Sequence, residues 1–347
     1  MDYDLKRLDP KHANDEDYKA ILEFVNAYRK EELPDDPPRS LEYLKNSLKS
    51  VEHFDSMDMR FWYLWDKDRV IGEVFTTAGL TDDNRHLLQL ELSVDKDYRR
   101  KGIGSHLLKT IVETADALER TLLITGTKDR VPAGEAFAKR IGAKAGLAAH
   151  VNRLDLNELD HALMQSWIDT GNQRAAEFEL GLWDSTLPED EIEVIAEMIS
   201  VMNTAPRDDL AIEDWKLTPD QLREWEAFMK ERGTQQRTYY ARHKPSRELA
   251  GYTQLHYNPE DVNTAQQGDT GVMPNYRGHG LGKWLKAAMV QRVQQDFPQV
   301  RYIRTGNADS NAPMLAINQQ MGFKPYFAET AWQVEVDTVK DYLRSRS

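Results

Sequence analysis

The chain has 347 residues, a formal net charge of −13 at pH 7 and no cysteine. Hydrophobic residues make up 40% of it and charged residues 30%, a balance typical of a soluble globular protein with a sizeable core. The absence of cysteine excludes disulfides, thiolate metal sites and a cysteine nucleophile. The acidic charge disfavours nucleic acids and anionic membranes as partners.

The chain shows neither a membrane-spanning run nor a secretion signal. No apolar stretch approaches the length needed to cross a bilayer. The first ten residues, MDYDLKRLDP, are charged and lack the apolar segment of a signal peptide. We therefore expect a cytoplasmic protein, monomeric or homodimeric, without a membrane partner. The nine histidines show no metal-ligand spacing such as HExxH, so no metal is expected.

The first half of the chain alternates helical and strand patterns. Period-2 and period-3.6 patterns predict helices at 15–30, 40–50, from about 104, and 132–141, and strands at 60–66, 69–79, 86–94, 121–125 and 147–154. The two strands on either side of 66–68 form a predicted hairpin. This order indicates a mixed α/β domain.

The second half repeats that order after two additional helices. Segment 155–175 is a predicted linking helix, and 187–199 is a helix whose acidic start favours the helix dipole. Strands are then expected at 237–243, 248–257, 265–273, 300–305 and 331–337, with helices from about 284 and at 311–320.

The two halves carry the same residues at one spacing. When Gly102 is aligned with Gly280, an offset of 178, Arg99 meets Arg277, Val94 meets Val272 and Glu91 meets Asp269. Motifs upstream and downstream keep this offset within two residues. We therefore predict two tandem copies of one mixed-sheet α/β domain, spanning 1–155 and 156–347.

A glycine-rich loop joins a strand to a helix in each copy. It reads YRRKGIG at 98–104 and YRGHGLG at 276–282. Glycines let successive backbone N–H groups point into one concavity, and the following helix adds its unpaired N–H groups and positive dipole end. A tight turn that binds no ligand is the simpler explanation. The loop occurs twice, at equivalent positions of the two copies, and this favours a site that holds a pyrophosphate.

The loop matches neither the dinucleotide fingerprint G-x-G-x-x-G nor the Walker pattern G-x-x-x-x-G-K-[ST]. It resembles instead the Arg-x-x-Gly-x-Gly coenzyme A loop of the GNAT superfamily of N-acetyltransferases. Segment 307–323, NADSNAPMLAINQQMGF, is similar to the closing segment of that family. The resemblance covers nearly the whole chain, and the tandem arrangement is similar to the mycothiol synthase-like acetyltransferases.

The resemblance implies acetyl-coenzyme A as cofactor, and a set of residues that bind it. Its pantetheine arm is expected along the strand that precedes each loop, and its pyrophosphate on the loop amides. The implied cofactor residues of the second copy are Thr270, Gly271, Val272, Arg277, Gly278, His279, Gly280, Leu281, Gly282, Lys283, Asn307 and Asn311. Those of the first copy are Val94, Arg99, Arg100, Lys101, Gly102, Ile103 and Gly104.

The resemblance further implies acetyl transfer to a primary amine of a small molecule by direct attack. Asp269 is the expected base, although a solvated strand-end carboxylate is the alternative. Where the family commonly has a tyrosine acid, this chain has Asn318, which can donate a hydrogen bond but cannot supply a proton. Val131 and Ala143 stand where the second copy has Asn311 and Phe323, so catalysis is expected in the second half.

The first half is expected either to bind acetyl-coenzyme A without catalysis or only to support the fold. The acidic segments 30–40 and 203–215 border the expected acceptor sites and would attract a cationic amine. Two rival functions stay open: a non-catalytic acyl-coenzyme A binder or sensor, favoured by Asn318, and an interaction protein without the ligand.

Overall fold

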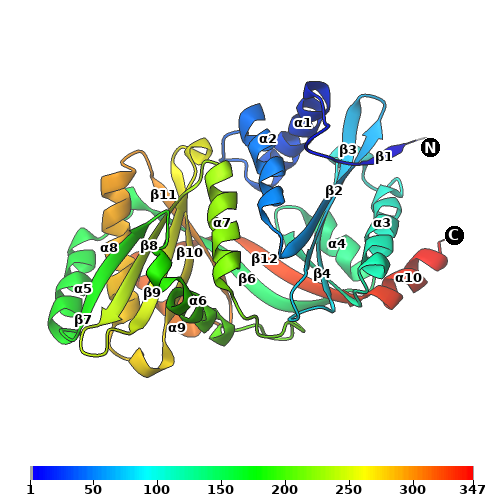
Figure 1. Cartoon of the computed structure of the whole chain (residues 1–347). Coiled ribbons are helices and arrows are strands. Elements are labelled where there is room, and N and C mark those ends of the chain that lie inside the picture. Colours follow the sequence, from blue (N-terminus) through cyan, green and yellow to red (C-terminus); the bar gives the residue numbers. More distant parts are fainter. Residues whose placement is uncertain (1–2, 347) are drawn as a thin grey trace. The chain divides into compact units, whose positions relative to one another are not determined.

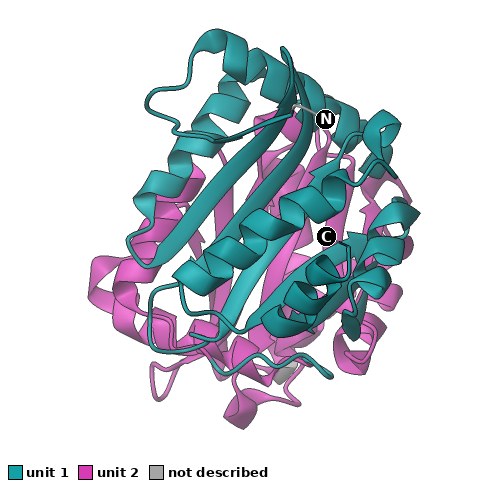
Figure 2. Cartoon of the chain, turned by 90° about the vertical axis from the view of Figure 1, so that its right-hand side faces the viewer, with its two compact units in different colours: residues 1–149, 207–214, 327–347 teal, residues 150–206, 215–326 magenta. Residues whose placement is uncertain are grey.

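The two repeats fold as two units with the same succession of strands, as the computed structural model of residues 3–346 shows (Figures 1 and 2). Unit 1 comprises 1–149, 207–214 and 327–347, and unit 2 comprises 150–206 and 215–326. Helices and strands mix within each unit, so the predicted mixed α/β class is confirmed.

Unit 1 places its strands in the order β1-β2-β3-β4-β5-β12, antiparallel except for the parallel pair β4/β5. The strands are β1 (Asp4–Arg7), β2 (Met57–Asp66), β3 (Arg69–Gly79), β4 (Leu87–Val94), β5 (Leu122–Lys128) and β12 (Lys324–Glu335, in unit 1 from residue 327). The helices are α1 (Asp15–Glu32), α2 (Leu41–Lys49), α3 (Ile103–Ala117), α4 (Pro132–Arg140) and α10 (Val336–Arg344).

Apolar alternation along these strands gives the sheet two buried faces. Leu64 and Ile71 pack with Ile111 of α3 in one cluster. Tyr63 faces the other way and packs with Ile21 of α1. Because successive strand residues point to opposite faces, β2 and β3 each contribute to both clusters.

Unit 2 repeats the pattern in the order β6-β11-β10-β9-β8-β7, with β10/β11 as its parallel pair. Its strands are β6 (Lys144–Asp155, in unit 2 from residue 150), β7 (Phe178–Asp184), β8 (Gln235–His243), β9 (Leu249–Tyr257), β10 (Thr264–Val272) and β11 (Tyr302–Ala308). Its helices are α5 (His161–Arg174), α6 (Ile192–Ile199), α7 (Pro219–Glu231), α8 (Leu281–Asp296) and α9 (Ala312–Met321).

The last strand of each repeat does not stay with the repeat that precedes it. β12 pairs antiparallel with β5, and Trp332 Nε1 donates to Thr127 Oγ1 at 2.8 Å. Conversely, Leu154 of β6 packs with Met321 and Phe323 of unit 2. The structure therefore divides the chain differently from the predicted 1–155 and 156–347, because the two closing strands are exchanged between the repeats.

Segment 207–214 also belongs to unit 1, although it lies between two helices of unit 2. The Ala211 amide donates to Gln333 Oε1 at 2.8 Å, and the Glu213 amide donates to Asn84 Oδ1 at 2.8 Å. Asp208 and Asp209, expected beside the acceptor site of the second copy, lie in this segment.

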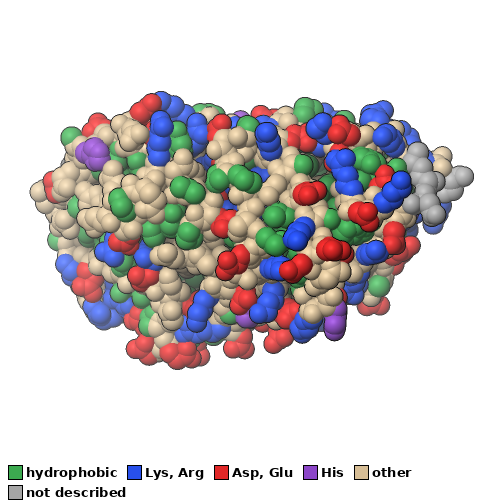
Figure 3. All heavy atoms as spheres, turned by 90° about the horizontal axis from the view of Figure 1, so that it is seen from above, with side chains coloured by type: hydrophobic (Ala, Val, Ile, Leu, Met, Phe, Trp, Pro, Cys, Tyr) green, Lys and Arg blue, Asp and Glu red, His purple; other side chains and the backbone are tan. Residues whose placement is uncertain are grey.

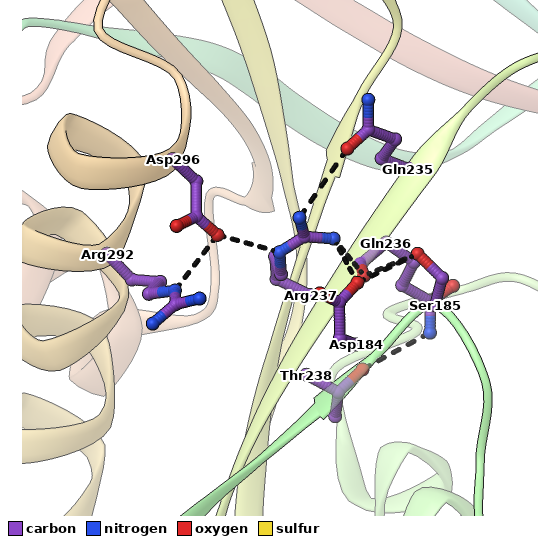
Figure 4. A network of polar contacts seen from close by, with 8 residues as sticks. All are labelled: Asp184, Ser185, Gln235, Gln236, Arg237, Thr238, Arg292 and Asp296. Atoms are coloured by element: carbon purple, nitrogen blue, oxygen red, sulfur yellow. Dashed lines mark hydrogen bonds and ion pairs between the residues drawn. The ribbon is translucent and has the colours of Figure 1, made fainter.

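A buried arginine ties the end of α8 to the sheet of unit 2 (Figure 4). Arg237 on β8 donates to Asp296 Oδ2 at 2.9 Å and to Asp184 at the end of β7. Arg292, one turn earlier in α8, donates to the same Asp296 oxygen at 2.9 Å. The network holds the helix whose other end carries the glycine loop.

Charges of both signs are interspersed over the face seen in Figure 3. The net charge of −13 is therefore not gathered into one acidic patch on that face. Within residues 3–346, the structure contains no helix that combines the length and apolar character needed to span a bilayer.

Candidate functional site

The parallel strand pair of each unit opens partway along its length. β4 pairs with β5 from Leu87 to Leu90, yet continues to Val94 with only β3 beside it. β10 pairs with β11 only from Thr264 to Gln266, and its register against β9 shifts between Gln267 and Thr270. Beyond these points β4 and β10 have no second strand partner among the described residues. Glu91 directly follows the last residue of β4 that pairs with β5, and Asp269 lies three residues beyond the last residue of β10 that pairs with β11.

Each glycine loop follows the strand that opens and ends on a helix. Gly102 (φ 85°) is the N-cap of α3, and Gly280 (φ 78°) is the N-cap of α8, in each case without a side-chain cap. A further left-handed position holds Arg100 (φ 66°) in unit 1 and Gly278 (φ 86°) in unit 2.

The space above the loop glycines is open. A Cβ atom added at Gly102, Gly278 or Gly280 would meet no heavy atom of the protein within 4 Å. The helices begin there with uncapped N–H groups and the positive end of the dipole. The loops therefore fit a pyrophosphate that approaches the backbone closely.

The arginine of each loop is bonded within the protein. Arg99 Nε donates to the Val94 carbonyl at 3.0 Å, and its two terminal nitrogens donate to Glu31 at 2.6 Å. Arg277 Nε donates to the Val272 carbonyl at 3.1 Å, and its Nη2 to Thr204 Oγ1 at 2.8 Å. These arginines hold the loop on the strand end, so ligand contacts fall to the backbone amides.

Other predicted cofactor residues of unit 2 lie on the loop and on neighbouring elements. Asn311 caps α9 by accepting from the Met314 amide, and His279 Nδ1 lies 3.2 Å from the Tyr276 carbonyl oxygen. Lys283 Nζ lies 5.0 Å from the centroid of the Trp167 ring. The remaining unit 2 positions lie on β10, on the loop, in the first turn of α8 and on β11, namely Thr270, Gly271, Val272, Leu281, Gly282 and Asn307.

Asn318 occupies an interior position. Its exposed fraction is 1%, and its amide nitrogen donates to Asn307 Oδ1 at 2.6 Å. This contact fits a residue that orients Asn307, and the side chain also lacks a transferable proton.

Carboxyl groups with raised pKa values mark the start of both openings. Asp269 keeps one side open to solvent, but the protein atoms around it desolvate the carboxyl and raise its pKa. Glu91 is likewise exposed on one side, and desolvation by the surrounding protein atoms raises its pKa against the opposing effect of the Lys128 charge. Desolvation disfavours the charged form of each carboxyl.

Sequence reasoning missed a second carboxyl in unit 1. Glu73 on β3 accepts a hydrogen bond from the Tyr63 hydroxyl at 3.0 Å. Burial, with the nearby charge of Glu91, raises the pKa of Glu73 to about 7. The sequence feature that could have identified Glu73 is the presence of a charged residue inside the apolar run VIGEVF.

Unit 1 contains a cavity of about 310 Å³ at its glycine loop. Its walls come from the end of β4, the loop, the first turn of α3, and α4. Five of the residues predicted to bind the cofactor line it, namely Val94, Arg99, Arg100, Gly102 and Gly104. Lys101 and Ile103 belong to the same loop and helix start.

Comparison with protein families gives two matches of one kind. Residues 58–142 match an acetyltransferase (GNAT) domain model, and residues 198–323 match the acetyltransferase (GNAT) family model. No curated protein matches the sequence.

Solved structures share the fold over nearly the whole chain. A tandem GNAT protein from the clavulanic acid biosynthesis pathway has 24% identity and a TM-score of 0.77, covering 96% of this chain and 99% of its own. A GCN5-related N-acetyltransferase from Sphaerobacter thermophilus has 13% identity and a TM-score of 0.61, with 96% of each chain covered. A putative acetyltransferase from Pyrococcus horikoshii has 14% identity and a TM-score of 0.55, covering 96% and 89%.

At these identities the solved structures show the fold alone, and the family models add the activity. Both halves carry the opened strand pair and the glycine loop. The chain is an acyltransferase of the GNAT family, with two acetyltransferase domains in tandem.

Proposed function

We propose that the protein transfers the acetyl group of acetyl-coenzyme A directly to a primary amine of a small cationic molecule, and that unit 2 carries out the transfer. The observation that carries the proposal is Asp269. It lies on β10 three residues beyond the end of the pairing with β11, its pKa is raised by the protein atoms that desolvate it although one side stays exposed, and its carboxyl has no hydrogen bond or ion pair with any described residue.

The backbone of unit 2 supplies the cofactor contacts in this proposal. The amides of the loop and the first turn of α8, from Gly278 to Lys283, receive the pyrophosphate. The free edge of β10 from Thr270 to Val272 receives the pantetheine arm. When bound, acetyl-coenzyme A supplies a thioester whose carbonyl carbon accepts the amine nitrogen.

Asp269 acts as the general base. An ammonium cannot attack a carbonyl, so the carboxylate takes one proton from the acceptor, directly or through water. Its raised pKa makes it a stronger base than an ordinary aspartate, and activity should fall as the pH falls through that pKa. Glu91 in unit 1 differs in its surroundings, because the charges of Lys128 and Glu32 act on it in addition to desolvation.

The departing thiol needs little help from the protein, since thiols ionise near pH 8 to 9. Tyr252 supplies a hydroxyl close to the base. It is fully buried, and its oxygen has no partner among the described residues. Burial and the charge of Asp269 hold its pKa well above the ordinary value, so the hydroxyl stays protonated and able to donate.

For unit 1 we propose acetyl-coenzyme A binding without transfer. The 310 Å³ cavity beside its loop supports binding. The Glu91 carboxyl of unit 1 lies near an ion pair, in which Lys128 Nζ donates to Glu32 Oε2 at 2.9 Å.

The test is an acetylation assay with a panel of diamines, amino sugars and amino acids, following thiol release from acetyl-coenzyme A. We expect Asp269→Asn to lower kcat at least a hundredfold with unchanged acetyl-coenzyme A affinity, and Glu91→Gln to retain most of the rate. If Glu91→Gln abolished transfer and Asp269→Asn did not, the reaction would belong to unit 1. A chain that binds the cofactor but acetylates none of the amines would support the sensor alternative.

A further inference from the structure

The helix at the end of the described chain, α10, forms part of the cofactor cavity of unit 1. Tyr342 of α10 and Arg346, two residues beyond it, line the cavity together with the loop and α4. The Tyr342 hydroxyl lies 3.0 Å from Ser105 Oγ in the first turn of α3, and the Arg346 guanidinium lies 5.1 Å from the Tyr342 ring centroid. A segment that follows the second repeat therefore completes the site of the first.

The charged residues lining this cavity are all arginines, although the chain carries a net charge of −13. They are Arg99, Arg100, Arg140 and Arg346. Glu31 neutralises Arg99, whereas the other three make no ion pair with any described residue. Three unpaired guanidinium groups around one cavity select a ligand with several negative charges.

The arginines divide by their position in the fold. Arg100 belongs to the loop, where the backbone amides already meet a pyrophosphate. Arg140 ends α4 and Arg346 follows α10, so both lie outside the loop. Coenzyme A carries one phosphate beyond its pyrophosphate, the 3′-phosphate of its adenosine, and guanidinium forks match phosphate oxygens.

We propose that Arg346, with Arg140, binds the 3′-phosphate of coenzyme A in unit 1, and that Tyr342 holds Arg346 in place. The proposal rests on the proposed binding of acetyl-coenzyme A to unit 1. It makes the cofactor affinity of the first repeat depend on residues that follow the second.

The experiment uses the full chain with Gly282→Glu, which blocks the loop of unit 2 and leaves one site. Calorimetric titrations compare coenzyme A with 3′-dephospho-coenzyme A. We expect Arg346→Ala to weaken coenzyme A binding about tenfold and to leave dephospho-coenzyme A binding unchanged. Arg344→Ala, which removes an exposed arginine of the same helix that pairs with Asp341, is the matched control and should change neither affinity.

Each result separates the two proposals. Equal weakening of both ligands by Arg346→Ala would overturn the 3′-phosphate assignment, and so would no change in either. If the Gly282→Glu chain bound no coenzyme A while the unsubstituted chain bound one equivalent, unit 1 would not be a cofactor site and both proposals for it would fail. Recovery of coenzyme A affinity in Arg346→Lys would support a phosphate contact over a role in folding.

Discussion

The guanidinium of Arg99 donates two hydrogen bonds of 2.6 Å to the carboxylate of Glu31. Glu31 lies in the last turn of α1, and Arg99 follows β4, so the pair joins the helix to the cofactor loop. Both side chains are mostly buried, with exposed fractions of 20% and 28%. In unit 2, Arg277 contacts the neutral Thr204 instead, so the two loops are held with different strength.

Glu31→Gln should lower the free energy of unfolding by about 2 kcal/mol, because it leaves the Arg99 charge partly buried without its partner. The free energy is obtained from urea denaturation. Glu135→Gln is the control, since Glu135 forms an exposed pair with Lys139 and its loss should cost less than about 0.5 kcal/mol. Equal effects of the two substitutions would contradict a structural role for the Arg99 pair.

Gly282 offers a clean test of the cofactor cradle in unit 2. It lies in the first turn of α8, and a Cβ there would meet only Ile317 Cδ1, at 3.5 Å. A glutamate suits this first turn, but its carboxylate repels a phosphate. Gly282→Glu should therefore keep the fold and weaken cofactor binding at unit 2 at least a hundredfold.

Calorimetry with acetyl-coenzyme A should then show the stoichiometry falling from two equivalents to one. Gly282→Ala is the matched control, because it adds a methyl group without charge and should retain both sites. Two equivalents bound to the Gly282→Glu chain would show that the loop of unit 2 is not a cofactor site.

Glu73 should make unit 1 less stable as the pH rises. Its pKa is about 7 in the folded chain against an ordinary value of 4.5, so between these values the folded state holds more protons than the unfolded state. Stability is therefore lost from pH 4.5 to 7, by up to about 3 kcal/mol. Glu73→Gln keeps an acceptor for Tyr63 and should remove this loss.

The check is the urea midpoint of both proteins at pH 5 and pH 8. Glu73→Gln should match the unsubstituted chain at pH 5 and exceed it at pH 8. Glu113→Gln, at an exposed site on α3, should leave the pH dependence as it was. A parallel dependence in all three proteins would refute the role of Glu73.

Lys286 is buried in α8 with an exposed fraction of 1%, and burial lowers its pKa to about 7. Below its unfolded pKa the unfolded chain binds this proton more readily, so stability should rise from pH 7 toward 10.5. Lys286→Met should raise the free energy of unfolding at pH 7 by about 3 kcal/mol, and by less at pH 10.

Denaturation at the two pH values measures this difference. Lys109→Met, at an exposed position of α3, should have little effect at either pH. A loss of stability in Lys286→Met at pH 7 would mean that the charged ammonium is stabilised in place, for which the Phe323 ring, with its centroid 5.6 Å from Lys286 Nζ, is the candidate partner.

The sequence alone was sufficient to predict the repeat, the glycine loops and most of the central strands and helices. Gly102 and Gly280 occupy equivalent positions of the two repeats, and both have a left-handed backbone. This conformation and the close approach of a ligand favour glycine, and the requirement is local, so it can be read from the sequence. Period-2 alternation predicted β3 and β9 for the same local reason. Edge strands β1 and β7 and helices α7 and α10 were missed, as their patterns are short or mostly polar.

Tertiary structure decided which sheet each closing strand joins. β12 reads as the last strand of the second repeat, yet Trp332 and Val334 lie in unit 1 beside β5. Strand pairing is a non-local choice, and one repeat can accept the closing strand of its twin without a change in local pattern. The same exchange brings Tyr342 to Ser105, more than two hundred residues away, and no periodicity in the sequence could reveal that contact.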